Sequence, residues 1–182
     1  PVLLSIVPSD SSLNSRPNKI IATFNKYMEV GDLSSQMSVS PMLPMNPTVL
    51  SLGKKIQIKL IDSLLQPNTT YKISFGNAIT DNRESTPYAD FSYIFSTGAY
   101  FDSLMYAGRV INALTGAPDS GIMVALYDVT VNDSAILTQK PLYTTRANAQ
   151  GFFQLDLLPN KPFKLFVIAD EDNNFVYNYT KE

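Results

Sequence analysis

The chain has 182 residues, which is long for one small β-sandwich and sufficient for two domains of about 90 residues each. Charged residues make up 16% of the chain, below the ~25% of an average domain, and the formal net charge is −2. The 14 basic residues are scattered, which argues against nucleic-acid binding. The absence of His and Cys excludes Ser-His-Asp and Cys-His catalysis, His-ligated zinc and disulfides, so we expect no enzyme.

The first half of the chain alternates between apolar and polar residues in short segments. Every second side chain of such a segment is expected to face a core. The inward-facing residues predicted in this way are Ile20, Ala22, Phe24, Ile56, Ile58, Leu60, Tyr71, Ile73, Phe75, Phe91, Tyr93 and Phe95. Closely spaced prolines between residues 41 and 47 suppress helix. We therefore expect at most single helical turns, at 31–35 and 61–66, and a sandwich of short strands.

Five motifs of this half occur in the order that is typical of one family. They are Ile6-Val-Pro-Ser-Asp10, Ile20-x-Ala-x-Phe24, Met37-Ser-Val-Ser-Pro41, Leu65-x-Pro67-x-Thr69-Thr-Tyr71 and Phe95-Ser-Thr-Gly98. Together they resemble the S-layer-type bacterial immunoglobulin-like domain, over residues 1–98. The resemblance implies an immunoglobulin-like β-sandwich for this part of the chain.

The second half has its own set of alternating segments. We expect Phe153 and Leu155 to face inward, followed by a turn at Leu158-Pro159 and by a strand that buries three further residues: Phe163, Leu165 and Val167. Gly151-x-Phe153-x-Leu155 followed by Leu-Pro resembles the carboxypeptidase regulatory-like (transthyretin-like) domain, over residues 103–170. The fold class that we predict is all-β, with two tandem sandwiches: residues 1–98 immunoglobulin-like and residues 99–182 transthyretin-like.

The two modules in this order resemble the N-terminal part of envelope-anchored lipoproteins of Gram-negative bacteria. The resemblance implies an extracytoplasmic location, in the periplasm or at the outer-membrane surface, with a lipid anchor upstream of this chain. No apolar run approaches the ~20 residues of a membrane span, so we expect none in this chain. The expected partner is an envelope protein or a glycan.

One acidic cluster has the spacing of a calcium loop. Asp170, Asp172 and Asn174 occupy alternate positions, as the first oxygen ligands of such a loop do. The Gly and the Glu that an EF-hand loop requires further on are replaced by Phe175 and Lys181. A weak calcium site is one interpretation of the cluster, and a plain polar turn is the other. We expect no other cofactor.

Several tyrosines do not fit the inward-facing alternation. They are Tyr88, Tyr100, Tyr106, Tyr177 and Tyr179. Tyrosines near loops can stack on sugars or anchor a protein partner, so these are the predicted contact residues.

The sequence contains no catalytic set, and the function that it favours is a non-catalytic envelope module, acting as a spacer or a binding scaffold. Two alternatives remain open. The chain can be a carbohydrate- or protein-binding adhesin module that uses the loop aromatics, or the accessory region of a larger envelope hydrolase.

Overall fold

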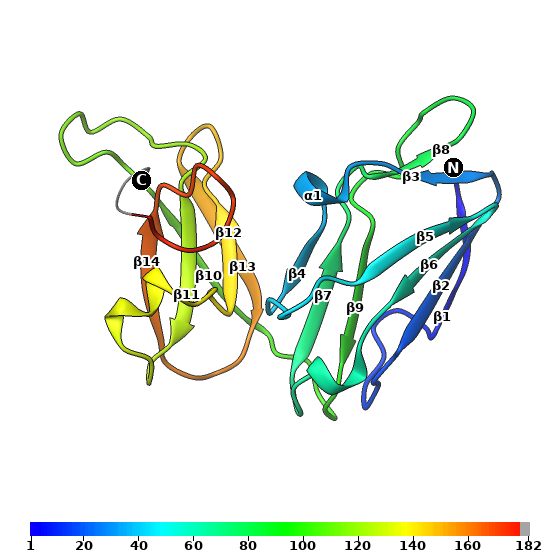
Figure 1. Cartoon of the computed structure of the whole chain (residues 1–182), viewed down its shortest axis with the longest axis horizontal. Coiled ribbons are helices and arrows are strands. Elements are labelled where there is room, and N and C mark those ends of the chain that lie inside the picture. The colour runs from blue at the N-terminus through cyan, green and yellow to red at the C-terminus, as the bar shows by residue number, and fades with distance from the viewer. Residues whose placement is uncertain (179–182) are drawn as a thin grey trace. The chain divides into compact units, whose positions relative to one another are not determined.

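A computed structural model describes residues 1–178 (Figure 1). The chain divides into two compact units, Pro1–Phe101 and Asp102–Glu182. Nearly all regular structure in the described residues is antiparallel β-sheet, with one α-helical turn and two 3₁₀ turns. The predicted all-β fold class is therefore confirmed.

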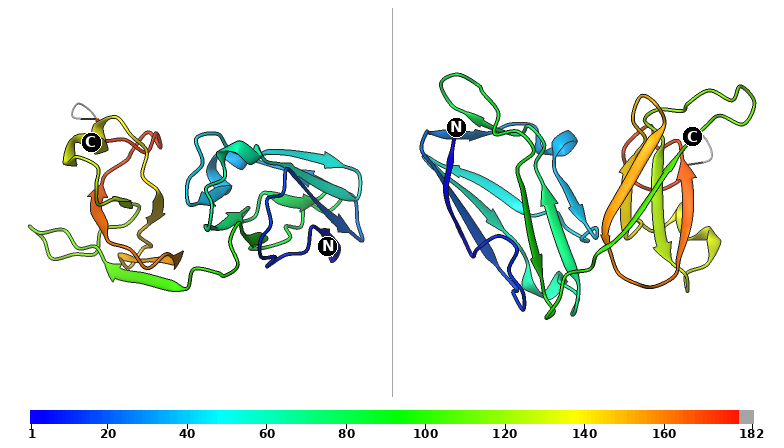
Figure 2. Two further views of the ribbon diagram at one scale, coloured as in Figure 1. Left: turned by 90° about the horizontal axis from the view of Figure 1, so that it is seen from below. Right: turned by 180° about the vertical axis from the view of Figure 1, so that it is seen from behind.

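The first unit is a sandwich of two main sheets (Figures 1 and 2). One sheet has the order β1-β2-β6-β5, with bounds Leu3–Val7, Lys19–Phe24, Lys55–Lys59 and Thr48–Leu52. The other has the order β4-β7-β9, with bounds Ser38–Ser40, Thr70–Ser74 and Ser92–Ser96. A short pair at one end joins β3 (Met28–Val30) to β8 (Ile79–Asp81).

The alternation predicted for the first unit is confirmed by the burial of its side chains. All twelve residues expected to face inward are buried, and most of them are completely inaccessible to solvent. They form one core between the two sheets, in which the Phe75 and Phe91 rings stack with centroids 5.3 Å apart. Stacked and edge-on aromatic pairs stabilise a core beyond the area that they bury.

The two expected helical turns of this unit are also present. They are α1 (Leu33–Gln36) and the 3₁₀ turn η1 (Asp62–Leu64). Asp32 caps α1, because its Oδ1 accepts a hydrogen bond from the backbone N–H of Ser34 at 2.9 Å. Each turn stays short because no apolar helical stripe supports it.

The second unit has a two-stranded and a three-stranded sheet. The first pairs β10 (Leu104–Arg109) with β13 (Phe152–Leu158). The second has the order β12-β11-β14, with bounds Tyr143–Arg146, Met123–Asp128 and Phe163–Ile168. A 3₁₀ turn, η2 (Asp133–Leu137), follows β11.

Strand β11 is buried on both faces. Met123, Ala125 and Tyr127 pack with Phe166 and Ile168 in one cluster, on one side of the strand. Leu126 packs on the other side, with a second cluster: Tyr143, Leu155, Leu158 and, partly buried, Phe163.

The inward face predicted for β14 is therefore wrong at two positions. Leu165 and Val167 are 38% and 48% exposed, whereas their neighbour Ile168 is buried. The alternation divides the residues of β14 between two faces, and both faces carry apolar side chains. An alternation with a period of two residues therefore does not show which face the core covers. Phe153, also expected in the core, is only half-buried, and its ring lies over Gly108, where an added Cβ would be 2.8 Å from the ring.

Candidate functional site

The predicted calcium loop is closed by the protein's own hydrogen-bond donors. The side chain of Asp170 is completely buried, and its Oδ1 accepts from the backbone N–H of Asn174 at 3.1 Å. Asp172 Oδ1 accepts from the same N–H at 3.2 Å. Asn174 Oδ1 accepts from the N–H of Val176 at 2.7 Å. The three predicted ligands are thus neighbours in one loop, and each serves as a turn acceptor.

A guanidinium supplies the positive charge of this loop. Arg146 Nη2 lies 2.7 Å from Asp170 Oδ2 and 2.8 Å from Asn173 Oδ1. Arg146 Nη1 donates to the carbonyl of Gly121 at 2.6 Å, so the side chain also ties the loop to the start of β11. Between residues 1 and 178, no group of three His, Cys, Asp or Glu side chains is arranged to hold a metal ion. Calcium binding stays a prediction. In this structure the guanidinium of Arg146 balances the negative charge of Asp170.

The predicted contact tyrosines lie in different environments. Tyr100 is 55% exposed and Tyr106 is 49% exposed. Tyr88 is partly buried, and its ring packs edge-on against Phe24 with centroids 5.3 Å apart. Tyr177 packs against the cluster around β11. Tyr179 lies outside the described residues. A contact role for these tyrosines stays a prediction, with Tyr100 and Tyr106 the most accessible.

Tyr106 lines an apolar groove of the second unit. The groove has a volume of about 270 Å³ and is formed by β10, the end of β13 and β14. Leu104, Met105 and Leu165, all exposed, line it together with Tyr106. These residues occupy strands that each have a free edge in their own sheet.

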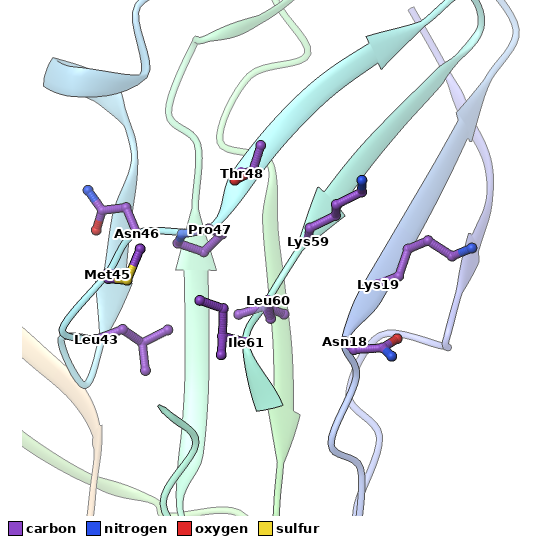
Figure 3. A pocket seen from close by; sticks show the side chains of 10 residues that line it. All are labelled: Asn18, Lys19, Leu43, Met45, Asn46, Pro47, Thr48, Lys59, Leu60 and Ile61. Carbon is purple, nitrogen blue, oxygen red and sulfur yellow. The ribbon is translucent and has the colours of Figure 1, made fainter. Parts of the chain in front are cut away.

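A larger pocket opens on the first unit, at the edge where β2 begins and β6 ends (Figure 3). It has a volume of about 510 Å³. Three segments that are distant in sequence line it: residues 18–19, 43–48 and 59–61. The pocket therefore exists only when the sheet order β2-β6-β5 has formed.

The lining of this pocket has a buried apolar part and an exposed part that is mostly polar, with Met45 and Ile61 as its exposed apolar members. Buried Leu43, Pro47 and Leu60 form the floor. The exposed polar residues that line it are Asn18, Lys19, Asn46, Thr48 and Lys59. Figure 3 shows Lys19 and Lys59 on neighbouring strands, across from the segment that carries Asn46.

The sequence did not predict this pocket. The alternation of residues 55–60 predicts that the side chain of Lys59 points outward, because its neighbours Ile58 and Leu60 face the core. The register that sets Lys19 opposite Lys59 follows from strand pairing, which no single segment reveals.

In the described part of the chain, no helix combines the length and apolar character needed to cross a membrane.

Comparison with curated proteins gave no match. Solved structures similar to this chain include BcpA, the major pilin subunit of Bacillus cereus, with 12% identity and a TM-score of 0.28. That similarity covers 90% of this chain and 57% of the pilin. A backbone pilin of Streptococcus pyogenes, with a modular three-domain structure, has 12% identity and a TM-score of 0.29, over 91% of this chain and 46% of its own. The chain thus spans about half the length of these pilins.

A family model matches the first unit. The model describes the bacterial Ig-like domain, and it covers residues 1–97, more than half of the 182 residues. The sandwich of β1–β9 and its single core agree with this match. The protein therefore belongs to the bacterial Ig-like domain family.

Proposed function

We propose that the protein is a non-catalytic module of a bacterial surface, acting outside the cytoplasm as a spacer or a binding scaffold. The family match supports the structural part of this proposal. The finer assignments extend the resemblances found in the sequence: a transthyretin-like second unit, and a place in a lipid-anchored protein of a Gram-negative envelope.

The observation that carries the proposal is that two buried carboxylates, those of Asp81 and Asp170, stabilise the fold. Asp81 Oδ1 accepts from the backbone N–H groups of Arg83 and Glu84, at 2.8 and 2.9 Å. Lys26 Nζ lies 3.2 Å from its other oxygen. The hydrogen bond from the Glu84 N–H, more than any other contact, lowers the pKa of Asp81. A carboxylate held ionised by a turn is unsuited to act as a general acid, which needs a raised pKa.

Asp170 has the same kind of role in the second unit. Its two oxygens are taken by the guanidinium of Arg146 and by backbone N–H groups of its own loop. Asp81 and Asp170 are thus both turn acceptors with a cation beside them. This pattern supports a protein whose polar interior stabilises the fold.

A binding role is the second candidate, and the groove at Tyr106 favours it. An exposed tyrosine beside exposed Leu104 and Met105 provides the aromatic and apolar surface that protein contacts use. This role is that of an adhesin module. This role is compatible with a spacer, because a protein of two sandwiches can act as a spacer through one of them and bind a partner through the other.

Two measurements test the proposed function. The purified chain is assayed on glycoside, ester and peptide substrates, where we expect no turnover. In the native bacterium, antibodies against the chain are expected to label protein outside the cytoplasm. Turnover that is lost in Asp81→Asn or Asp170→Asn, at a retained fold, contradicts the non-catalytic role. Labelling confined to the cytoplasm contradicts the location.

A further inference from the structure

Two lysines lie side by side on neighbouring strands of the first unit. Lys19 begins β2, Lys59 ends β6, and the antiparallel register makes them direct partners. Direct partners have their Cβ atoms about 4.5–5.5 Å apart on the same face of a sheet. Both side chains are exposed. Like charges in this arrangement destabilise a sheet, so the pair reduces the stability of the fold.

Among the described residues, no acidic side chain pairs with either of these lysines. The acid closest to Lys59 along the chain is Asp62, and its carboxylate is bound by Arg16, with Nε and Oδ1 2.8 Å apart.

The sheet that carries the lysine pair is free of acidic residues. Strands β1, β2, β5 and β6 contain Lys19, Lys55 and Lys59 and no Asp or Glu. The formal net charge of the whole chain is −2. The outer face of this sheet is therefore a local positive surface on a protein that is weakly acidic. Such a surface attracts anions.

The lysine pair lines the pocket of about 510 Å³ described above. This volume is within the range of about 300–1,000 Å³ that is usual for small-molecule sites. Asn18, Asn46 and Thr48 also line the pocket, with Asn46 across from the lysines, and they offer both donors and acceptors. Buried Leu43, Pro47 and Leu60 give the site an apolar floor.

We propose that this pocket binds an acidic saccharide. The negative group of the sugar, a carboxylate, lies between the ammonium groups of Lys19 and Lys59. Its hydroxyl groups exchange hydrogen bonds with the amides of Asn18 and Asn46 and with the hydroxyl of Thr48. The bound anion reduces the repulsion between the two ammonium groups. Binding therefore stabilises the sheet that carries them. The inference deepens the binding-scaffold part of the proposed function and rests on its extracytoplasmic location.

A saccharide fits the pocket better than an anionic membrane surface does. The site is concave, and its amide and hydroxyl groups match a ligand rich in hydroxyls. A membrane surface is broad and engages lysines spread over a face together with inserted apolar side chains. Lys19 and Lys59 are instead concentrated at one pocket, and Lys55 lies at the opposite end of β6.

Binding of the full 182-residue chain is measured by calorimetry against polygalacturonate, alginate and hyaluronate. Dextran and methyl-esterified polygalacturonate serve as neutral probes. We expect at least one acidic polysaccharide to bind and the neutral probes not to bind. Because charge-assisted contacts are the strongest in such a site, Lys19→Gln and Lys59→Gln should each weaken binding by roughly tenfold. Raising the salt from about 50 to about 500 mM should weaken it further.

Lys55→Gln is the matched control, because Lys55 projects from the same face of the same strand but does not line the pocket. We expect it to change the affinity less than twofold. All three lysines are exposed, so the variants are expected to keep their fold, which circular dichroism checks. Vesicles of phosphatidylcholine with phosphatidylglycerol provide the membrane arm of the experiment.

Three outcomes overturn the proposal. They are no binding to any acidic polysaccharide, an equal loss in Lys55→Gln and Lys59→Gln, and binding to anionic vesicles alone. The second outcome indicates diffuse attraction, and the third indicates a membrane surface. None of these outcomes bears on the proposed function as a whole, which fails through turnover or through a cytoplasmic location.

Discussion

At the scale of single residues, the second unit depends on one guanidinium. Arg146 is partly exposed, but the carboxylate that it binds, Asp170, is completely buried. A buried carboxylate without its cation carries a large desolvation penalty. The sequence shows both residues but not their pairing, because 24 positions separate them and three strands must align first.

Replacing Arg146 should therefore destabilise the second unit strongly. For Arg146→Met we expect a loss of about 3 kcal/mol, at the low end of the range for breaking a buried pair, because the guanidinium is partly exposed. Urea unfolding measures this loss. Lys161→Met is the control, since both partners of its ion pair with Asp128 are partly exposed and such pairs contribute little. Equal effects of the two substitutions would contradict the role assigned to Arg146.

The hydroxyl of Tyr127 makes the second unit sensitive to high pH. Burial raises the pKa of Tyr127 from 10.0 to about 12, and the charge of Asp170 adds to the effect. The unfolded chain loses this proton near pH 10, whereas the folded unit keeps it until about pH 12. The contribution of Tyr127 to stability is therefore complete below pH 10 and is lost as the pH rises toward 12.

We expect Tyr127→Phe to reduce this loss of stability at alkaline pH. The substitution also removes the hydrogen bond from the hydroxyl to the carbonyl of Gln139, 3.0 Å long, so the variant is less stable at neutral pH. Urea unfolding between pH 8 and pH 12, with tyrosinate absorbance recorded in parallel, measures both effects. The same decline with pH in both proteins would show that Tyr127 is not responsible.

At the scale of elements, the alternation of apolar residues predicted the strands of the first unit well. It placed Phe24, Ile58 and Phe95 inward, and all three are completely buried. It was less successful in the second unit, because η2 and the loop after β14 cover a face of β11 that would otherwise meet solvent. An alternation with a period of two residues shows which side chains share a face of a strand. It does not show whether one or both faces are covered by other parts of the protein.

The candidate pocket was beyond prediction for a related reason. Its lining comes from three segments, and Lys19 meets Lys59 only through the register of β2 and β6. Each of these lysines, taken alone in the sequence, resembles any solvated strand end. The loop around Asp170 shows the opposite case, since the sequence identified the acidic cluster but not the guanidinium of Arg146 that compensates it.

The sequence predicted that Phe24 in β2 and Phe153 in β13 both face the core. We expect truncation of the two rings to have different effects on the free energy of unfolding. Phe24→Ala in β2 is expected to cost about 3–5 kcal/mol, because the ring is completely buried and packs against Tyr88 and Phe91. Phe153→Ala in β13 should cost clearly less, since its ring is half-buried over Gly108. Denaturant unfolding of both variants measures the difference. A larger loss for Phe153→Ala would show that burial is misassigned in β13.

The lysine pair gives a prediction of the opposite sign. Lys59→Gln removes the repulsion between β2 and β6, so the first unit should gain roughly a few tenths of a kcal/mol. Lys55→Gln is the control, because its partner across the strands is the uncharged Thr23. The gain should disappear at high salt, where the repulsion is screened. A loss of stability in Lys59→Gln at low salt would show that the ammonium group has a stabilising partner.

At the scale of the whole molecule, each hydrophobic cluster draws its residues from one compact unit. The large cluster lies entirely within Pro1–Phe101. The two smaller clusters lie within the second unit, around the two faces of β11. A unit with its own core has what independent folding requires. The first unit, with one large core, is expected to be the more stable of the two.

We therefore expect residues 1–101 to fold when they are produced alone. The fragment retains every residue of the large cluster and both main sheets of the Ig-like sandwich. Its unfolding midpoint in urea should match the midpoint assigned to the first unit in the full chain, where Phe24→Ala identifies that transition by shifting it. Arg146→Met serves as the reciprocal marker, because it should shift the other transition and leave this one in place. An unfolded fragment, or one transition that responds equally to both substitutions, would show that the two units fold as one.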